Sequence, residues 1–153
     1  MLTFEFVGGI IENRLTHQTS LLGTFLMNRQ REFILVGGMF ALTAVILGAF
    51  GAHALENRLE SLGTVAVWQT AVDYQMWHAL GILVIAISRL SGRAASFAMS
   101  SFCLGVPLFS GSLYWLALDG PRWLGPITPL GGLLLVIGWA TLIVAAFKMR
   151  TDP

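Results

Sequence analysis

Four long apolar runs limit what this chain can fold into more than any other feature. They cover residues 33–54, 64–88, 94–118 and 129–147. A bilayer core about 30 Å thick needs about 20 mostly apolar residues per helix. In lipid, only helices or closed barrels satisfy every backbone polar group, and runs this long and continuous are typical of helices. The runs therefore predict an all-α fold, an integral membrane bundle of four transmembrane helices.

The composition supports the membrane class and excludes others. Hydrophobic residues make up 56% of the 153 residues and charged residues 11%, whereas a soluble domain carries about 25% charged residues. The net charge of +1 argues against a nucleic-acid partner, because the chain has too few basic residues to neutralise a phosphate backbone. Cys103 is the single cysteine, which excludes an intrachain disulfide and a cysteine-based zinc site. We expect the lipid bilayer as partner and no cofactor.

The segments between the runs are also informative. A short amphipathic helix is predicted between the first two runs, because leucines at helical spacing face one side and charges the other: Leu55, Leu59 and Leu62 against Glu56, Arg58 and Glu60. Residues 89–93 form a tight polar turn, and residues 119–126 form a loop rich in glycine and proline. Thr128 and Pro129 resemble an N-cap and first helical position, and they indicate where the last helix begins.

The first 26 residues do not fit the rest. They are only moderately apolar and lack the basic start and cleavage site of a signal peptide. The stretch Met27-Asn-Arg-Gln-Arg31 would itself be a natural short basic start before the first span. We expect residues 1–26 to be a disordered or spurious extension and residues 27–153 to form one four-helix transmembrane domain.

Small residues recur along one side of the first span. They follow steps of three and four, which keeps them in one stripe of a helix: Gly37, Ala41, Ala44, Gly48 and Ala52. Such a stripe lets two helices approach closely, and in lipid this packing drives association. We expect the stripe to pack against another helix. His53 follows it, and we expect its side chain to hydrogen-bond a residue between Gln69 and His78.

Most polar residues within the spans fall toward one side of the membrane. The candidate cluster comprises His53, Asp73, Tyr74, Gln75, His78, Ser110, Ser112 and Tyr114. Ionisable groups within a span are costly and raise a functional hypothesis. Structural roles compete with it: Asp73 could anchor the helix at the interface, and His78 could make a plain interhelical hydrogen bond. Pro107 removes one backbone hydrogen bond, which produces either a simple kink or a cavity lining.

Several blocks of the sequence resemble a known family. They are "GAFGAHAL", "WQTAVDYQMWHALG", "LFSGSLY" with "LALDG", and "LGPITPLGG" with a later "GW". In this order they resemble the YgdD-like family of small bacterial inner-membrane proteins, a domain of unknown function with a eukaryotic transmembrane relative. The resemblance implies four helices in the bacterial inner (cytoplasmic) membrane. It implies no activity, ligand or catalytic residue.

Three hypotheses of function remain open. The first is a non-enzymatic accessory or assembly partner of other membrane proteins, or of itself, since little chain lies outside the spans. The second is a small transporter or channel that uses Asp73 and His78 in an outer polar pocket. The third is a site for haem, lipid or quinone, with two histidines as axial ligands of a haem iron. The Gly-x-Ser-x-Gly motif of serine hydrolases is absent, and we expect no enzyme.

The distribution of basic residues predicts the orientation. The N-terminus, the second loop and the C-terminus share one side, which holds seven of the nine basic residues, and the other side holds only Arg58 and Arg122. Cytoplasmic loops carry the excess of Lys and Arg, so both termini should be cytoplasmic. In cysteine accessibility scanning, position 122 should be labelled from outside and position 93 should not. The reverse labelling would contradict this topology.

Overall fold

The computed structural model describes residues 30–88, 90 and 92–148, and these form helices joined by short turns. Four helices are long and apolar enough to cross a membrane, which confirms the predicted spans. The helices are Gln30–Ala52, called the first helix below, α2 (Glu56–Leu62), α3 (Val65–Ile87), α4 (Arg93–Val106), the π-helix η1 (Pro107–Gly111), α5 (Ser112–Ala117), the 3-10 helix η2 (Arg122–Leu124) and α6 (Ile127–Lys148). The extension expected over residues 1–26 lies outside the described residues. The packing below belongs to the unit that begins at Phe33.

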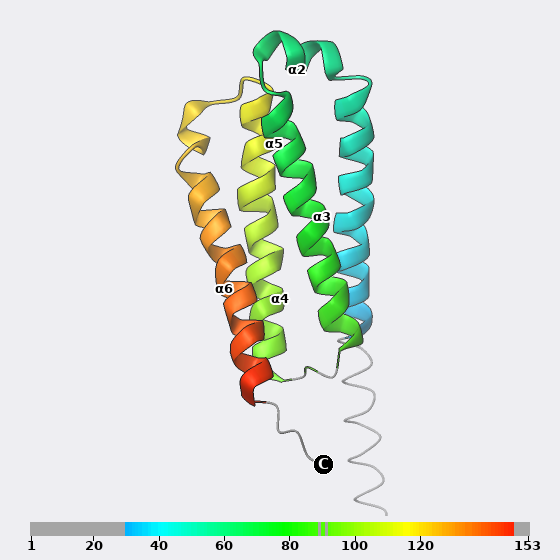
Figure 1. The fold of residues 1–153 in the computed structure, drawn as a ribbon, viewed down its shortest axis with the longest axis vertical. Helices are drawn as coiled ribbons and strands as arrows, with labels where there is room; N and C mark the ends of the chain where they lie inside the picture. Colours follow the sequence, from blue (N-terminus) through cyan, green and yellow to red (C-terminus); the bar gives the residue numbers. More distant parts are fainter. Residues whose placement is uncertain (1–29, 89, 91, 149–153) are drawn as a thin grey trace, which may run out of the picture. The chain divides into compact units, whose positions relative to one another are not determined.

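The short helix α2 crosses one end of the bundle between the first helix and α3 (Figure 1). Leu59 is buried against Trp68 and Ala117, while the charged residues of α2 are exposed, so the amphipathic helix is confirmed. Gly63 ends α2 with a φ of 67°, a left-handed conformation that glycine adopts without strain. Thr64 then donates a hydrogen bond to the carbonyl of Ala117 at 2.6 Å. This bond ties the turn before α3 to the end of α5.

Two helices are central and two are peripheral. In their most apolar stretches, 50% of the residues of α3 and 44% of those in the helix from Arg93 to Ala117 are buried. In the same stretches, only 11% of the residues of the first helix and 17% of those of the last, Arg122–Lys148, are buried. Each peripheral helix therefore presents most of its surface to its surroundings, where large apolar side chains such as Leu35, Val45 and Val136 are exposed.

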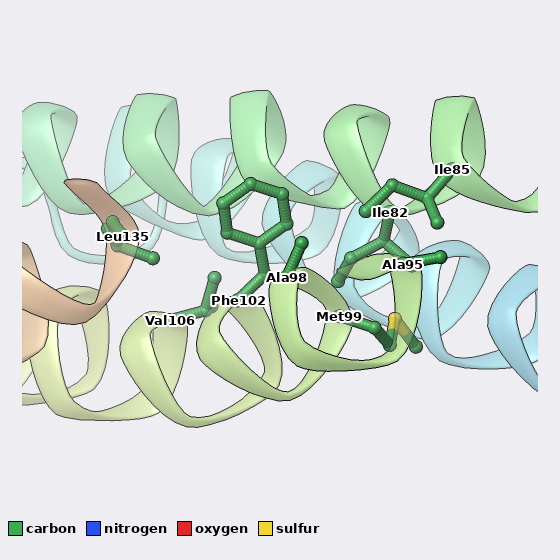
Figure 2. Packing of buried hydrophobic residues seen from close by; sticks show 8 residues of the cluster. All are labelled: Ile82, Ile85, Ala95, Ala98, Met99, Phe102, Val106 and Leu135. Atoms are coloured by element: carbon green, nitrogen blue, oxygen red, sulfur yellow. The ribbon is translucent and has the colours of Figure 1, made fainter. Parts of the chain in front are cut away.

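The largest buried cluster joins α3, α4 and α6 around the ring of Phe102. Figure 2 shows this ring among the side chains of both neighbouring helices. The cluster comprises Ile82, Ile85, Ala95, Ala98, Met99, Phe102, Val106 and Leu135. Lipid tails are as apolar as these side chains, so close van der Waals packing stabilises the cluster rather than removal from water.

Glycines allow α6 to approach α4 and η1 closely. A Cβ atom at Gly131 would lie less than 3.0 Å from the backbone of Leu108 and Phe109, and one at Gly138 would enter the ring of Phe102. Gly105 faces the side chain of Leu135 in the same way. Gly131 and Gly138 lie on α6, on either side of Leu135, and Gly105 lies on α4, so glycines of both helices form the contact.

The small residues of the first helix lie along α3 for most of their length. A Cβ atom at Gly37 would meet the side chains of Ile82 and Leu83, Ala44 is fully buried, and a Cβ atom at Gly48 would lie 3.4 Å from Val72. Ala41 is half-buried. At the end of the stripe, Ala52 is exposed, and Gly51 takes its place.

The indole of Trp68 explains this shift at the end of the stripe. It lies so close to Gly51 that a Cβ atom there would collide with the ring. A glycine at position 51 is therefore required by one large side chain on α3, which a pattern of small residues on one helix does not reveal.

Two adjacent glycines of α6 provide a matched test of this packing. Gly131→Ala should lower the free energy of unfolding by about 1–3 kcal/mol, because overpacking forces the backbone of η1 away. A Cβ atom at Gly132 would have only ordinary contact with the ring of Phe109, at 3.4 Å. Gly132→Ala should therefore be neutral or stabilising, since alanine favours helix by about 1 kcal/mol. Unfolding of both variants by SDS in mixed micelles measures the difference. Equal stabilities would show that α6 does not approach η1 this closely.

Candidate functional site

The polar residues expected to form one cluster are distributed over several separate sites. Gln75 and Tyr114 lie together, and His78, Asp73 and Ser112 each bond to other partners. The side chain of Tyr74 stacks beside those of His78 and Phe109. The candidate functional site therefore centres on Gln75, the residue that connects the most helices.

Gln75 is 5% exposed, and its side chain links three helices. Its Nε2 donates to the carbonyl of Phe40 at 2.9 Å and to Oγ1 of Thr43 at 2.7 Å, both on the first helix. Its Oε1 accepts a hydrogen bond from the hydroxyl of Tyr114 on α5 at 3.1 Å. Because a backbone carbonyl can only accept, the Phe40 bond fixes which end of the amide is nitrogen. Tyr114 must then be the donor to Oε1.

A second side chain of α3 binds the first helix in the same manner. The indole N–H of Trp68 donates to the carbonyl of Leu47 at 3.0 Å. In both bonds the residue four positions after the acceptor is small: Ala44 follows Phe40, and Gly51 follows Leu47. A helical side chain covers the turn that precedes it, so a small residue there leaves the carbonyl accessible. Close packing and hydrogen bonding thus depend on the same small residues.

His78 is buried between α3 and α6. Its Nδ1 lies 2.6 Å from the carbonyl of Tyr74, and its Nε2 accepts a hydrogen bond from the indole N–H of Trp139 at 3.1 Å. A carbonyl accepts and an indole N–H donates, so Nδ1 carries the proton and Nε2 does not. Both ring nitrogens are therefore used within the bundle. The ring of Phe102 packs edge-on against the imidazole.

The π-helix η1 carries the residues around Pro107. The hydroxyl of Ser112 lies 2.6 Å from the carbonyl of Leu108, 2.9 Å from that of Phe109 and 2.7 Å from Oγ1 of Thr128 on α6. Within the described chain, the hydroxyl of Ser110 is buried without a hydrogen-bond partner. The π-helix begins at Pro107, which has no backbone N–H to donate. The hydroxyl of Ser112 bonds carbonyls of this segment.

In the described chain, neither Asp73 nor His53 makes a hydrogen bond to Gln75 or Tyr114. Asp73 accepts a hydrogen bond from Gln69 at 2.8 Å, on the exposed side of α3. His53 is exposed in the turn after the first helix, and among the described residues its side chain makes no hydrogen bond. The expected bond from His53 to α3 is thus absent, because the helix ends at Ala52 and the chain turns toward α2.

A pocket of about 230 Å³ lies beside the Gln75 network. It opens between the first helix, α3 and the segment from α4 to α5, and Pro107 at its edge is exposed. The polar side chains in its walls are those of Thr43, Gln75 and Tyr114. The whole lining, which is mainly apolar, comprises Phe40, Thr43, Leu47, Gln75, Val106, Pro107, Gly111 and Tyr114. Of the residues expected to form the polar cluster, only Gln75 and Tyr114 line this pocket.

Three important residues were not among the expected site residues. Thr43 accepts a hydrogen bond from Gln75 on α3, and Trp68 donates one to the first helix. Trp139 donates one to His78. A tryptophan in an apolar run gives no signal that distinguishes a lipid contact from a buried donor. In the part of the chain that the structure describes, no three His, Cys, Asp or Glu residues gather as a metal site would require.

Comparison with known proteins places the chain in a family. Residues 47–132, more than half of the chain, match the model of the family described as "Protein of unknown function (DUF423)". Relatives named UPF0382 membrane protein include one from Staphylococcus epidermidis, 46% identical over 77% of this chain and 97% of its own, and YwdK from Bacillus subtilis, 46% identical over 77% and 98%. A relative from Haemophilus influenzae is 38% identical over 81% of this chain and 98% of its own. No solved structure matches significantly.

The chain therefore belongs to the DUF423 family of UPF0382 membrane proteins. With its four candidate spans, it is an integral membrane protein. The names of these relatives describe membrane proteins and state no activity.

Removal of the central amide tests the Gln75 network. Gln75→Leu should lower the free energy of unfolding by about 1–3 kcal/mol, because the hydroxyl of Tyr114 loses its partner. Adding Tyr114→Phe to Gln75→Leu should cost less than the sum of the two single changes, since no unpaired hydroxyl remains. Thr70→Val is the control, because Thr70 is exposed and bonds only within its own helix. SDS unfolding that shows strict additivity would contradict the network.

Proposed function

We propose that this member of the DUF423 family is a non-enzymatic accessory protein, which packs its helices against other membrane proteins or a second copy of itself. The observation that carries the proposal is the low burial of the two peripheral helices, 11% for the first helix and 17% for the last. Transmembrane helices associate through close packing of complementary surfaces. Two long apolar faces on one small bundle provide such surfaces.

The bonding of the polar residues supports the same proposal. Gln75, His78 and Ser112 bond to neighbouring helices of the same chain. Such bonds hold the bundle together, so its peripheral helices are positioned for contact with other helices. In addition, only short segments join the spans in the part of the chain that the structure describes, which leaves little of this part outside the membrane to carry out chemistry.

The transporter hypothesis has less support. Asp73 and His78 are five residues apart on α3, which places them about 140° apart around the helix. Asp73 bonds Gln69 on the exposed side, and His78 bonds Trp139 between helices. A proton-linked pair would need the two side chains within reach of each other, and their partners hold them on different sides of α3.

The haem hypothesis has less support as well. His53 follows the end of the first helix, at the end of the bundle where α3 begins. His78 lies thirteen residues along α3, which is about 20 Å by helical rise. The two histidines are therefore at different depths. Two axial ligands must face one iron atom from both sides. Nε2 of His78 also accepts the hydrogen bond of Trp139. Of the third hypothesis, a lipid site has a pocket to support it, beside Gln75 and Tyr114.

We further propose that the protein lies in the bacterial inner membrane with both termini in the cytoplasm. The excess of basic residues at the termini and in the second loop supports this orientation. The basic residues Arg58, before α3, and Arg122, before α6, would then lie on the external side together with α2.

Site-specific photo-crosslinking in membranes tests the accessory role. A photoreactive residue at Leu35 on the first helix or Val136 on α6 should give a discrete product of higher mass, since both side chains are more than half exposed. Val84 is the matched control, because it is 57% exposed but lies on the central helix α3.

Three outcomes separate the possibilities. A product from Leu35 or Val136, together with a larger protein that co-purifies in mild detergent, supports an accessory role, and a product of twice the mass indicates a second copy. Products only with lipid at all three positions, from a protein that purifies alone, would contradict the proposal.

A further inference from the structure

We propose that the pocket beside Gln75 binds an apolar molecule that carries a hydroxyl group, and that this hydroxyl donates its hydrogen bond to the oxygen of Tyr114 or to Oε1 of Gln75. This inference goes beyond the accessory role and does not depend on it. It rests on three observations: the hydrogen bonds already made by the pocket's polar side chains, the depth of the pocket in the membrane, and its volume.

All polar hydrogens of the pocket's side chains are already used. Both hydrogens of the Gln75 amide are donated to the first helix. The hydroxyl of Thr43 lies within bonding distance of two carbonyls of its own helix, Met39 and Phe40, at 2.9 and 3.1 Å. The hydroxyl of Tyr114 donates to Gln75. The pocket therefore offers a ligand no side-chain donor.

Acceptor capacity remains on the same side of the pocket. The oxygen of Tyr114 donates one hydrogen bond and keeps its lone pairs, and Oε1 of Gln75 accepts one bond and can accept a second. A ligand hydroxyl satisfies such an acceptor by donating to it. A carbonyl or an ether would place its own lone pairs against these oxygens without a proton between them. The pocket should thus select alcohols and phenols over ketones, quinones and ethers.

The depth of the pocket excludes a charged or strongly polar ligand. Gln75 lies ten residues into α3, about 15 Å from its start by helical rise, and the helix is 23 residues long. Thr43 and Pro107 likewise lie in the middle part of their spans. Phospholipid headgroups stay at the surface of a hydrocarbon core about 30 Å thick. A ligand at this level must be apolar except for the group that faces Gln75.

The volume and walls fit such a ligand. A cavity of about 150 Å³ lined by apolar side chains can hold benzene, and this pocket has about 230 Å³. It has room for a substituted ring or for part of a branched chain. Gly111 contributes to this space, since a Cβ atom there would meet nothing within 4 Å. The π-helix that carries Gly111 is a type of segment found often at functional sites.

A matched pair of probes tests the selectivity. We would compare 4-butylphenol with its methyl ether, 4-butylanisole, which has a similar shape and no hydroxyl proton. Each probe is titrated against the purified full chain at fixed detergent concentration, and the rise in melting temperature gives an apparent Kd. The phenol should bind at least tenfold more tightly than the ether. Equal binding would overturn the proposal, as would no effect of either probe, which is the result for a pocket that holds only water.

A matched pair of variants tests the location. Gly111→Leu should fill the pocket and weaken binding of 4-butylphenol at least tenfold, and its helical backbone, with φ of −61°, accommodates a side chain. Gly38→Leu is the control, because Gly38 is exposed on the first helix with nothing within 4 Å of a Cβ atom. If Gly111→Leu does not fold, Gly111→Ala should still weaken binding by a smaller factor. Binding unchanged by the variant that folds would overturn the location.

Two sources could supply this chemistry, a lipid alcohol or a quinol. Competition against 4-butylphenol by decanol alone would indicate a lipid alcohol, and competition by a short-chain hydroquinone alone would indicate a quinol. Competition by both supports the shared hydroxyl chemistry, and competition by neither overturns the proposal. These binding results do not depend on any protein partner, so they can fail while the accessory role holds, and the reverse.

Discussion

The hydrogen bonds from Gln75 to the first helix are the interaction on which the rest of the arrangement depends. A buried amide in a membrane span is costly unless each of its groups is paired. Here the partners come from the first helix and from α5, so the pairing determines how three helices face one another. These bonds and that of Trp68 are the polar contacts of the first helix with the bundle, and they add to the close packing of its small residues along α3.

The small residues of the first helix have two roles that cannot be separated. Ala44 and Gly51 allow α3 to approach, and they also leave the carbonyls of Phe40 and Leu47 accessible to donors on α3. A larger residue at either position would lose the close contact and the hydrogen bond together. The other peripheral helix, α6, packs closely against α4 and η1 through glycines, and the bond from Trp139 to His78 adds a polar contact. The two peripheral helices are thus held by the same combination of forces.

Hydropathy predicted the four spans, because a long apolar run in a bilayer must satisfy its own backbone groups as a helix. Leucines on one side of a charged segment predicted α2, because this spacing is typical of an amphipathic helix. The candidate site was harder to predict. Asp73 and Gln75 are two residues apart, yet only Gln75 is buried, since the helical rotation places Asp73 toward the exposed side. Pro107 predicted either a kink or a cavity lining, but the walls of the pocket come from three helices, which no pattern within one span reveals. His53 was misplaced because the last turn of the first helix ends before it.

Hydrogen exchange of glutamine side-chain amides, followed by NMR in micelles, tests the central claim most directly. Gln69 and Gln75 lie on the same helix, but Gln69 is exposed and bonds only Asp73. Both amide protons of Gln75 should exchange far more slowly than those of Gln69, because each is donated inside the bundle. Exchange of Gln75 at the rate of Gln69 would contradict the account, since the amide would then not hold the first helix.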